Sequence, residues 1–187
     1  QAALAAVRPD QAVAAQLRRS GSLLTAGGET VDLADYDRVL VLGAGKAGAP
    51  MAQAVEAVLG DDLTGGLVVV KTGHSAPTRC VELVEAGHPV PTQAGLDAGA
   101  RVLQWAQAAG PRDLVLVLLS GGGSALLEAT AGVSLSDLQQ MTAALLACGA
   151  TIGEVNCLRK HMSLLKGGQL ARALYPARSI TLVLSDV

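Results

Sequence analysis

The sequence predicts a single α/β domain whose core is a doubly wound, mainly parallel sheet with helices on both faces. Its 187 residues fit one domain, since domains run to roughly 100–200 residues. Half of the residues are hydrophobic and 16% are charged, which supplies a buried core and argues against intrinsic disorder. Short apolar runs bounded by glycine alternate with segments of helical periodicity, as in parallel strands joined by helices.

The elements follow in order along the chain. Residues 1–20 are rich in alanine and predict an amphipathic helix that ends at Ser20-Gly21. Leu4, Val13 and Leu17 fall at helical spacing within it. Apolar runs too short for a helix are assigned as buried strands, and longer periodic segments as helices. The assignment is strand Arg38–Leu42, helix Met51–Leu59, strands Gly66–Lys71 and Val81–Glu85, helix Gly95–Ala108, strand Asp113–Leu119, helices Leu135–Ala147, Ile152–Ser163 and Gly168–Tyr175, and strand Ile180–Leu184.

Composition excludes a nucleic-acid-binding protein. The aromatic residues are Trp105, Tyr36 and Tyr175, with no Phe, and this is too few for a base-stacking surface. The formal net charge of -2 also argues against a polyanion partner. Residues 151–187 nevertheless carry five Lys and Arg against two Asp and Glu, so this end of the chain is expected to meet a small anion.

The cysteines and the apolar runs indicate a cytoplasmic protein with no membrane segment. Cys80, Cys148 and Cys157 match neither zinc spacing nor a disulfide framework and are expected to be buried, reduced thiols. The longest apolar strand is far below the ~20 residues that span a bilayer. Arg8 and Asp10 lie where the apolar region of a secretory signal peptide would be. Because the chain starts at Gln1 and stops at Val187, just after a strand, it is expected to be a trimmed fragment.

The first predicted strand leads into Gly43–Gly48, which matches the dinucleotide fingerprint G-x-G-x-x-G. The acidic ribose anchor expected about 20 residues later is absent, because the next strand ends at Lys71, a residue that would suit NADP better than NAD. Lys46 lies at a helix N-terminus, where it would bind phosphoryl or carboxylate oxygens and stabilise charge during phosphoryl transfer. The alternative is that these glycines only allow close packing of helix and strand.

A second glycine loop, Ser120–Ser124, follows the fourth predicted strand. Three consecutive glycines are costly to order, and a nest of backbone amides that binds an anion, with Ser120 and Ser124 as hydroxyl donors, would explain them. The chain contains no Walker A sequence. The alternative is a tight turn without a ligand.

A third group of polar residues lies on the predicted helix near residue 156 and just after it. Asn156, Arg159, Lys160 and Ser163 recur at three or four residues and predict one polar stripe, with Lys166 beyond it. The guanidinium of Arg159 could bind a carboxylate or phosphate through bidentate hydrogen bonds. The alternative is a helix face in solvent.

Two strand-end residues add further candidates. His88 lies in a proline-rich loop and is either a site residue or a structural one. Asp186 follows the last strand, where it would coordinate Mg²⁺, act as a base or cap a helix. His74 and His161 are weaker candidates.

Six motifs, taken in order, resemble the glycerate 2-kinase family of the MOFRL type. They are Gly43–Ala47, Glu85–Pro91, Ser120–Leu126, Glu154–Asn156 with Arg159–His161, Lys166–Gly168 and Ser185–Val187. The resemblance runs from Val39 to Val187. It implies ATP- and Mg²⁺-dependent phosphorylation of D-glycerate on its 2-hydroxyl, giving 2-phosphoglycerate. It also implies a Rossmann-like N-terminal domain, here residues 1–187, with the active site in a cleft against a C-terminal MOFRL domain. Association into a homodimer is left open.

The resemblance assigns residues in this sequence. Lys46 matches the family's catalytic lysine, Ser120–Ser124 its glycine-rich binding loop, and Asp186 begins its acidic motif. The candidate site residues are Lys46 and Asp186 for catalysis, Asp186 for the metal, and Gly43, Gly45, Lys71, His88, Ser120, Gly121, Gly122, Gly123, Ser124, Glu154, Asn156, Arg159, Lys160 and Lys166 for nucleotide or substrate. The loop that holds ATP and the loop that holds glycerate are not distinguished.

The sequence departs from the family pattern after Val187. The Gly-Asp pair that normally follows, the MOFRL domain and its active-site arginine are not in the chain, so the fragment alone is expected to have little or no kinase activity. Some members of the family are called hydroxypyruvate reductases, and an NAD(P)H-dependent reductase is the alternative enzyme. The alternative that is not an enzyme is a module that uses the same loops to bind anions.

Overall fold

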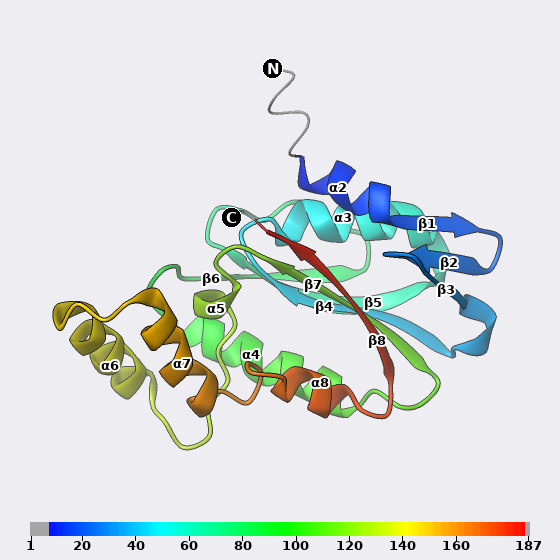
Figure 1. The fold of residues 1–187 in the computed structure, drawn as a ribbon. Coiled ribbons are helices and arrows are strands. Elements are labelled where there is room, and N and C mark those ends of the chain that lie inside the picture. The colour runs from blue at the N-terminus through cyan, green and yellow to red at the C-terminus, as the bar shows by residue number, and fades with distance from the viewer. Residues whose placement is uncertain (1–7, 186–187) are drawn as a thin grey trace.

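The computed structural model describes residues 8–185 and has a five-stranded sheet at its centre (Figure 1). The strands lie in the order β6-β5-β4-β7-β8, and every neighbouring pair is parallel. Their bounds are β4 Arg38–Ala44, β5 Leu63–Lys71, β6 Val81–Ala86, β7 Asp113–Ser120 and β8 Arg178–Leu184. The strand order reverses beside β4, so the predicted doubly wound parallel sheet is confirmed.

Helices cover both faces of this sheet. In Figure 1, α2 (Pro9–Gln16) and α3 (Gly48–Leu59) lie on one face, and α4 (Gln93–Gln107) and α8 (Gln169–Leu174) lie on the other. Alternate residues of β4 accordingly enter different cores: Val41 packs in the core on the α3 side and Leu42 in the core on the α4 side. Both side chains are fully buried, which explains why the sequence of this strand is an unbroken apolar run.

The prediction of one helix through residue 20 is wrong. Helix α2 ends at Gln16, and the chain continues into an antiparallel sheet of β1 (Leu17–Ser20), β2 (Leu23–Ala26) and β3 (Glu29–Asp32). Leu17 and Leu24 are buried in the same core as α3, so tertiary packing overrides the alanine-rich helical pattern. Residues 1–7, including Leu4, lie outside the described part of the chain.

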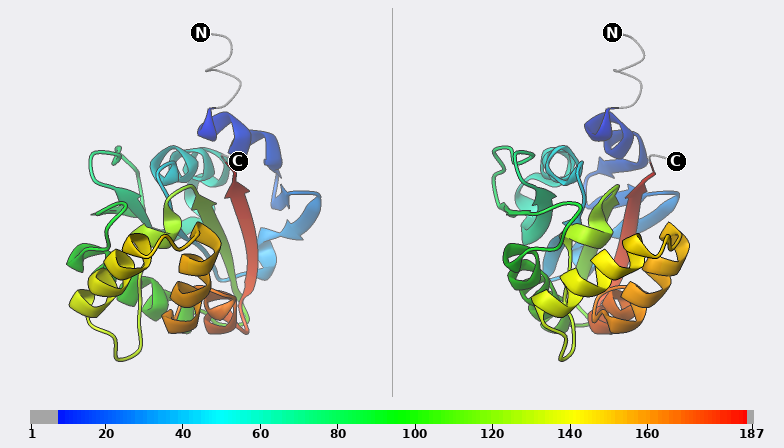
Figure 2. Two further views of the ribbon diagram at one scale, coloured as in Figure 1. Left: turned by 60° about the vertical axis from the view of Figure 1, so that its left-hand side comes forward. Right: turned by 90° about the vertical axis from the view of Figure 1, so that its left-hand side faces the viewer.

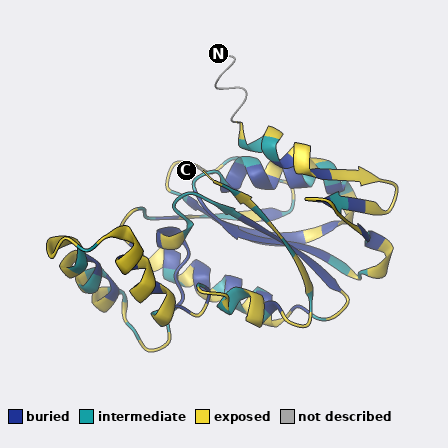
Figure 3. Ribbon diagram, in the orientation of Figure 1, coloured by how far each residue is buried: buried dark blue, intermediate teal, exposed yellow. Residues whose placement is uncertain are grey.

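The connection from β7 to β8 is long and helical. It contains α5 (Gly123–Leu126), α6 (Leu135–Ala147), α7 (Ile152–Met162) and α8, as well as the loops between them. Figure 2 shows α6, α7 and α8 on the same side of the sheet as α4, and Figure 3 shows that α6 and α7 are largely exposed. Two short 3-10 helices, η1 (Leu33–Asp35) and η2 (Gly60–Asp62), precede β4 and β5.

The carboxyl ends of the parallel strands lie at one edge of the sheet. The loop after β4 carries Lys46, the loop after β6 carries His88, and the loop after β7 is the glycine loop Ser120–Ser124. Because β4 and β7 are neighbours at the point where the strand order reverses, their loops meet at the position where doubly wound folds bind ligands.

Candidate functional site

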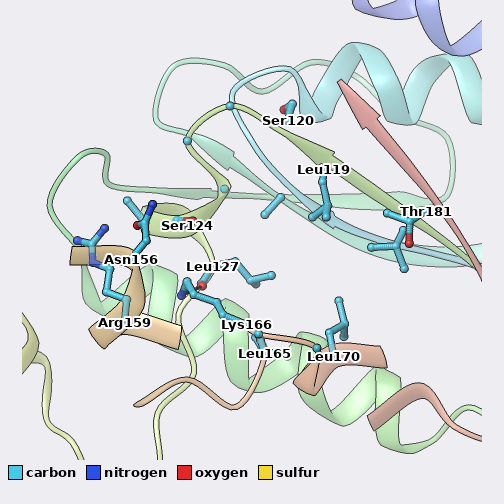
Figure 4. Close-up of a pocket in the computed structure, with 18 of the residues that line it drawn as sticks. Leu119, Ser120, Ser124, Leu127, Asn156, Arg159, Leu165, Lys166, Leu170 and Thr181 are labelled. Carbon is cyan, nitrogen blue, oxygen red and sulfur yellow. Dashed lines mark hydrogen bonds between the residues drawn. The ribbon is translucent and has the colours of Figure 1, made fainter. Parts of the chain in front are cut away.

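A cavity of about 810 Å³ opens beside the carboxyl end of β7, bounded by α7 and α8 (Figure 4). Part of its lining is apolar and includes Leu119, Leu170 and Leu174. The rest of the lining contains many of the candidate site residues. These are His88, Ser120, Gly121, Gly122, Gly123, Ser124, Asn156, Arg159 and Lys166.

The loop after β4 uses its backbone for packing against the loop after β7. The amides of Gly45, Lys46 and Ala47 donate to Val69 O, Gly121 O and Ser120 Oγ, at 3.0, 2.9 and 3.1 Å. These amides are therefore already satisfied within the protein. What this loop can offer a ligand is the side chain of Lys46.

The glycines of this loop are required by the same close approach. A Cβ on Gly43 would lie 2.3 Å from Leu118 O, and one on Gly45, whose φ is +146°, would lie 2.0 Å from Ser120 Oγ. Gly43 and Gly45 are buried and do not line the cavity. The structure thus agrees with the alternative that these two glycines serve close packing rather than ligand binding.

The backbone amides of the loop after β7 differ from those of the loop after β4. Within the described part of the chain, no residue accepts a hydrogen bond from the amides of Gly121, Gly122, Gly123 or Ser124. Gly122 adopts the left-handed conformation, with φ +86°. Free amides next to two serine hydroxyls form a surface that favours negative charge.

Lys46 and His88 meet over this loop. A Cβ built on Gly122 would lie 3.0 Å from His88 Cδ2 and 3.3 Å from Lys46 Cγ, so glycine is the residue that lets both side chains pack here. Burial lowers the pKa of His88, and the positive charges of Lys46, Lys71 and Arg159 lower this pKa further. The imidazole is therefore neutral at neutral pH and lies in a strongly electropositive environment.

Arg159 and Asn156 reach the cavity from α7. Arg159 is 8% exposed, and its Nη2 donates to Thr142 Oγ1 at 3.4 Å. No carboxylate within residues 8–185 forms a salt bridge with it. In Figure 4 Asn156 extends from α7 toward Ser124. A nearly buried guanidinium is costly when no carboxylate of the described residues neutralises it, which favours an anion as its partner.

Lys166 follows α7 in the chain and lines the cavity. Its ammonium group is hydrogen-bonded to the segment that follows α5. Its Nζ donates to Glu128 Oε2 at 2.6 Å and to Leu127 O at 2.7 Å. Burial lowers the pKa of Lys166, and the Glu128 carboxylate opposes that change. Glu128 is not among the residues predicted from the sequence. Its signal is a carboxylate inside the apolar run Leu126–Ala129, where burial requires a cation.

The four residues of the predicted polar stripe do not all face the cavity. Asn156 and Arg159 face the cavity, whereas Lys160 is exposed and does not line it. Ser163 is buried and structural, because its hydroxyl accepts from the amides of Leu165 and Lys166, both at 3.1 Å. The cavity is therefore lined by two of these four side chains, those of Asn156 and Arg159.

Other candidates lie around the cavity rather than in it. Glu154 is exposed and accepts from the amide and hydroxyl of Thr151 in a capping box, which lowers the pKa of its carboxyl. His74 is exposed and pairs through Nδ1 with Lys46 O at 3.2 Å, and His161 pairs likewise with Cys157 O at 2.7 Å. Asp186 lies outside the described residues, so its role stays a prediction.

The structure also bears on the cysteines and on membrane and metal features. The prediction that all three cysteines are buried is wrong: Cys80 is half-buried, and Cys148 and Cys157 are exposed because they lie at the end of α6 and on α7, which are largely in solvent. Across residues 8–185, no helix is both long and apolar enough to cross a membrane. The same residues hold no group of three or more His, Cys, Asp or Glu side chains that could bind a metal ion.

Comparisons with known proteins match the whole chain to one family. The sequence profile of a family described as a domain of unknown function, DUF4147, matches residues 1–187. A D-glycerate 2-kinase of Thermotoga maritima is 47% identical over 161 residues, which are 85% of this chain and 39% of the relative. A putative hydroxypyruvate reductase of Agrobacterium vitis is 48% identical over 151 residues, 80% of this chain and 34% of the relative.

A solved structure has the same fold. The crystal structure of a Pyrococcus horikoshii protein superposes with a TM-score of 0.90 at 37% identity, covering 97% of this chain and 41% of that one. The chain therefore spans well under half the length of the proteins that it matches.

Proposed function

The chain belongs to the DUF4147 family, and we propose that it contributes the anion-binding half of a D-glycerate 2-kinase that uses ATP and Mg²⁺. Residues 1–187 would form its Rossmann-like N-terminal domain, with a second domain across the cleft. The kinase named in Thermotoga maritima supports the reaction, and the cavity supports the chemistry. Alone, residues 1–187 would show little or no turnover, because the relatives are more than twice as long.

The observation that carries the proposal is that the amides of Gly121–Ser124, which have no acceptor within residues 8–185, line the same cavity as the nearly buried Arg159. Both favour negative charge, and D-glycerate and the phosphates of ATP are anions. Phosphoryl transfer needs mainly positioning and neutralisation of charge, which fixed amides and cations supply. In this mechanism Arg159 binds a carboxylate or phosphate, the loop amides bind a second oxygen group, and Lys46 stabilises the charge that develops on transfer.

Mg²⁺ is part of the proposed reaction, and Asp186 is the ligand that the sequence predicts for it. Mg²⁺ binds oxygen ligands, commonly one or two carboxylates together with substrate phosphates. The part of the chain that the structure describes offers no carboxylate cluster for it, and Asp186 lies outside that part. Asp186 therefore stays the proposed carboxylate ligand, and substrate phosphates would supply further oxygens.

The test measures glycerate-dependent ADP release by the native protein. We expect turnover that yields 2-phosphoglycerate, and a loss of at least about 100-fold in kcat for Lys46→Ala, the size typical of removing one charge-stabilising group. Lys160→Ala is the control, since this exposed lysine lies outside the cavity. Full activity in Lys46→Ala would instead favour a non-catalytic anion-binding module.

A second candidate, reduction of hydroxypyruvate by NAD(P)H, rests on the name of the Agrobacterium vitis relative. The satisfied amides of the loop after β4 weigh against it, because a dinucleotide fingerprint needs free amides at the pyrophosphate. Loss of nicotinamide absorbance with hydroxypyruvate, without ADP release in the presence of glycerate, would establish the reductase and reject the kinase.

A further inference from the structure

Glu128 is a buried carboxylate that the proposed function does not use. Its side chain is 2% exposed, and it lies two residues after the end of α5. Oε2 pairs with Lys166 Nζ, whereas Oε1 is buried and has no hydrogen-bond partner within residues 8–185. Taking a carboxylate out of water is costly, so a role that depends on its charge would explain why it is here.

Two contacts hold the backbone of Glu128 in place. On one side, a Cβ on Gly99 of α4 would lie only 1.8 Å from Glu128 O, and one on Gly95, a turn earlier, would lie 3.0 Å from Leu126 O. On the other side, the amide of Leu164 donates to Ala129 O at 2.8 Å. The segment that carries Glu128 is therefore fixed between α4 and the segment that carries Lys166.

Lys166 has one N–H donor more than its protein partners use. An ammonium carries three donors, and Glu128 Oε2 and Leu127 O take two of them. Within the described chain no third acceptor bonds to Nζ. Because Lys166 also lines the cavity, the third donor is available to a group bound there.

We propose that Glu128 is a positioning residue that acts through Lys166, keeping its ammonium charged and one N–H directed to the cavity. Lys166 and Arg159 then form a pair of fixed cations for one carboxylate or phosphate group of the substrate. The inference rests on the proposed function only in taking the cavity to bind anions. It assigns to the pair of Glu128 and Lys166 a role in affinity rather than in stability alone.

The test uses inorganic phosphate as the probe and isothermal titration calorimetry of the native protein. We expect Glu128→Gln to weaken phosphate binding at least about tenfold, the equivalent of one hydrogen bond to a charged group. Glu82→Gln is the matched control, because Glu82 also pairs with a cation, Arg101, but is exposed on β6 away from the cavity.

The pH dependence separates positioning from a structural role. The charged groups that act on Lys166 are Glu128, which raises its pKa, and Arg159, which lowers it. Without the Glu128 charge, Lys166 would lose its proton at lower pH, so the upper pH limit of phosphate binding should move down in Glu128→Gln. A loss of stability alone would leave that limit unchanged.

A double variant tests whether Glu128 acts through Lys166. In a Lys166→Gln background, adding Glu128→Gln should cause no further loss of phosphate affinity. Unchanged affinity and an unchanged pH limit in Glu128→Gln, or a full further loss in the double variant, would overturn the inference. Should Glu128→Gln not fold, Glu128→Asp replaces it, since it keeps the charge but withdraws it by one methylene. Phosphate binding does not need ADP release, so either proposal can fail without the other.

Discussion

At the scale of single residues, Gly122 lies where the glycine loop, His88 and Lys46 meet. A substitution to alanine there faces two penalties: φ of +86° strains any residue with a Cβ, and the Cβ would lie 3.0 Å from the His88 ring. We expect Gly122→Ala to displace His88 and to weaken phosphate binding to the native protein. Titration calorimetry with phosphate measures the effect.

The control for Gly122 is Gly132. It has a similar φ of +73°, but no atom lies within 4 Å of its Cβ position. Gly132→Ala should therefore pay only the backbone strain, about 1–2 kcal/mol of unfolding free energy, and should keep phosphate affinity. Equal affinities in the two variants would show that the contact with His88 has no part in binding.

The charge environment of His88 is also a property of single residues. Its pKa is lowered by burial, then by Lys46, Lys71 and Arg159. Removing one positive charge in Lys46→Gln should raise this pKa toward its ordinary value, because the protonated ring loses a repelling neighbour. NMR titration of the imidazole measures it, and Lys160→Gln should leave it unchanged. A His88 pKa unmoved by Lys46→Gln would show that the two groups are not coupled.

At the scale of elements, α4 packs on the segment after α5 through a glycine. Alanine normally stabilises a helix interior relative to glycine by about 1 kcal/mol. At Gly99 the added Cβ would lie 1.8 Å from Glu128 O, a backbone atom that cannot move freely. We expect Gly99→Ala to lower the free energy of unfolding by about 3 kcal/mol, as overpacking does. Urea denaturation measures the change.

Gly153 gives the opposite expectation on another helix. It lies in the first turn of α7, is exposed, and its nearest neighbour would be Thr151 Oγ1 at 3.9 Å from the added Cβ. Gly153→Ala should be neutral or stabilising by up to about 1 kcal/mol. A stabilising Gly99→Ala would mean that α4 can move away from residue 128.

At the scale of the whole molecule, local patterns predicted the parallel sheet but not every element. The strands of this sheet are buried on both faces, so their apolar runs stand out in the sequence, as in Asp113–Leu119. The antiparallel sheet of β1–β3 was missed, because its strands have four residues each and the alanine-rich pattern before them favours a helix. Only packing against α3 distinguishes the two outcomes.

The candidate site was predictable in position but not in detail. Strand ends place His88 and Ser120–Ser124 at one edge of the sheet, and that placement needs no side-chain contact. Which amides are free depends on how the loops after β4 and β7 pack on each other, and the pairing of Glu128 with Lys166 joins positions 38 apart in the chain. Such long-range contacts leave no local pattern in a single sequence.

The beginnings of the central strands β4 and β7 are joined by two ion pairs, and these predict how the whole domain responds to acid. Asp113 is buried and accepts from Arg38 Nε and Nη2 at 2.8 and 2.6 Å, while Asp37 and Arg112 form an exposed pair next to it. Asp113→Asn should cost about 1–2 kcal/mol of unfolding free energy at pH 7, allowing for the partial exposure of Arg38. Asp37→Asn should cost about 0–1 kcal/mol.

The pH dependence of that difference follows from the pKa of Asp113. Hydrogen bonding to Arg38 lowers this pKa below the unfolded value of about 3.9. A carboxyl with a lowered pKa contributes stability that is fully present above the unfolded pKa and is lost as pH falls through the folded one. The gap in unfolding free energy between wild type and Asp113→Asn should therefore be constant from pH 7 to about 5 and close below about pH 4. Urea denaturation at each pH tests this, and a gap that persists at pH 2 would mean that Asp113 contributes through its shape rather than its charge.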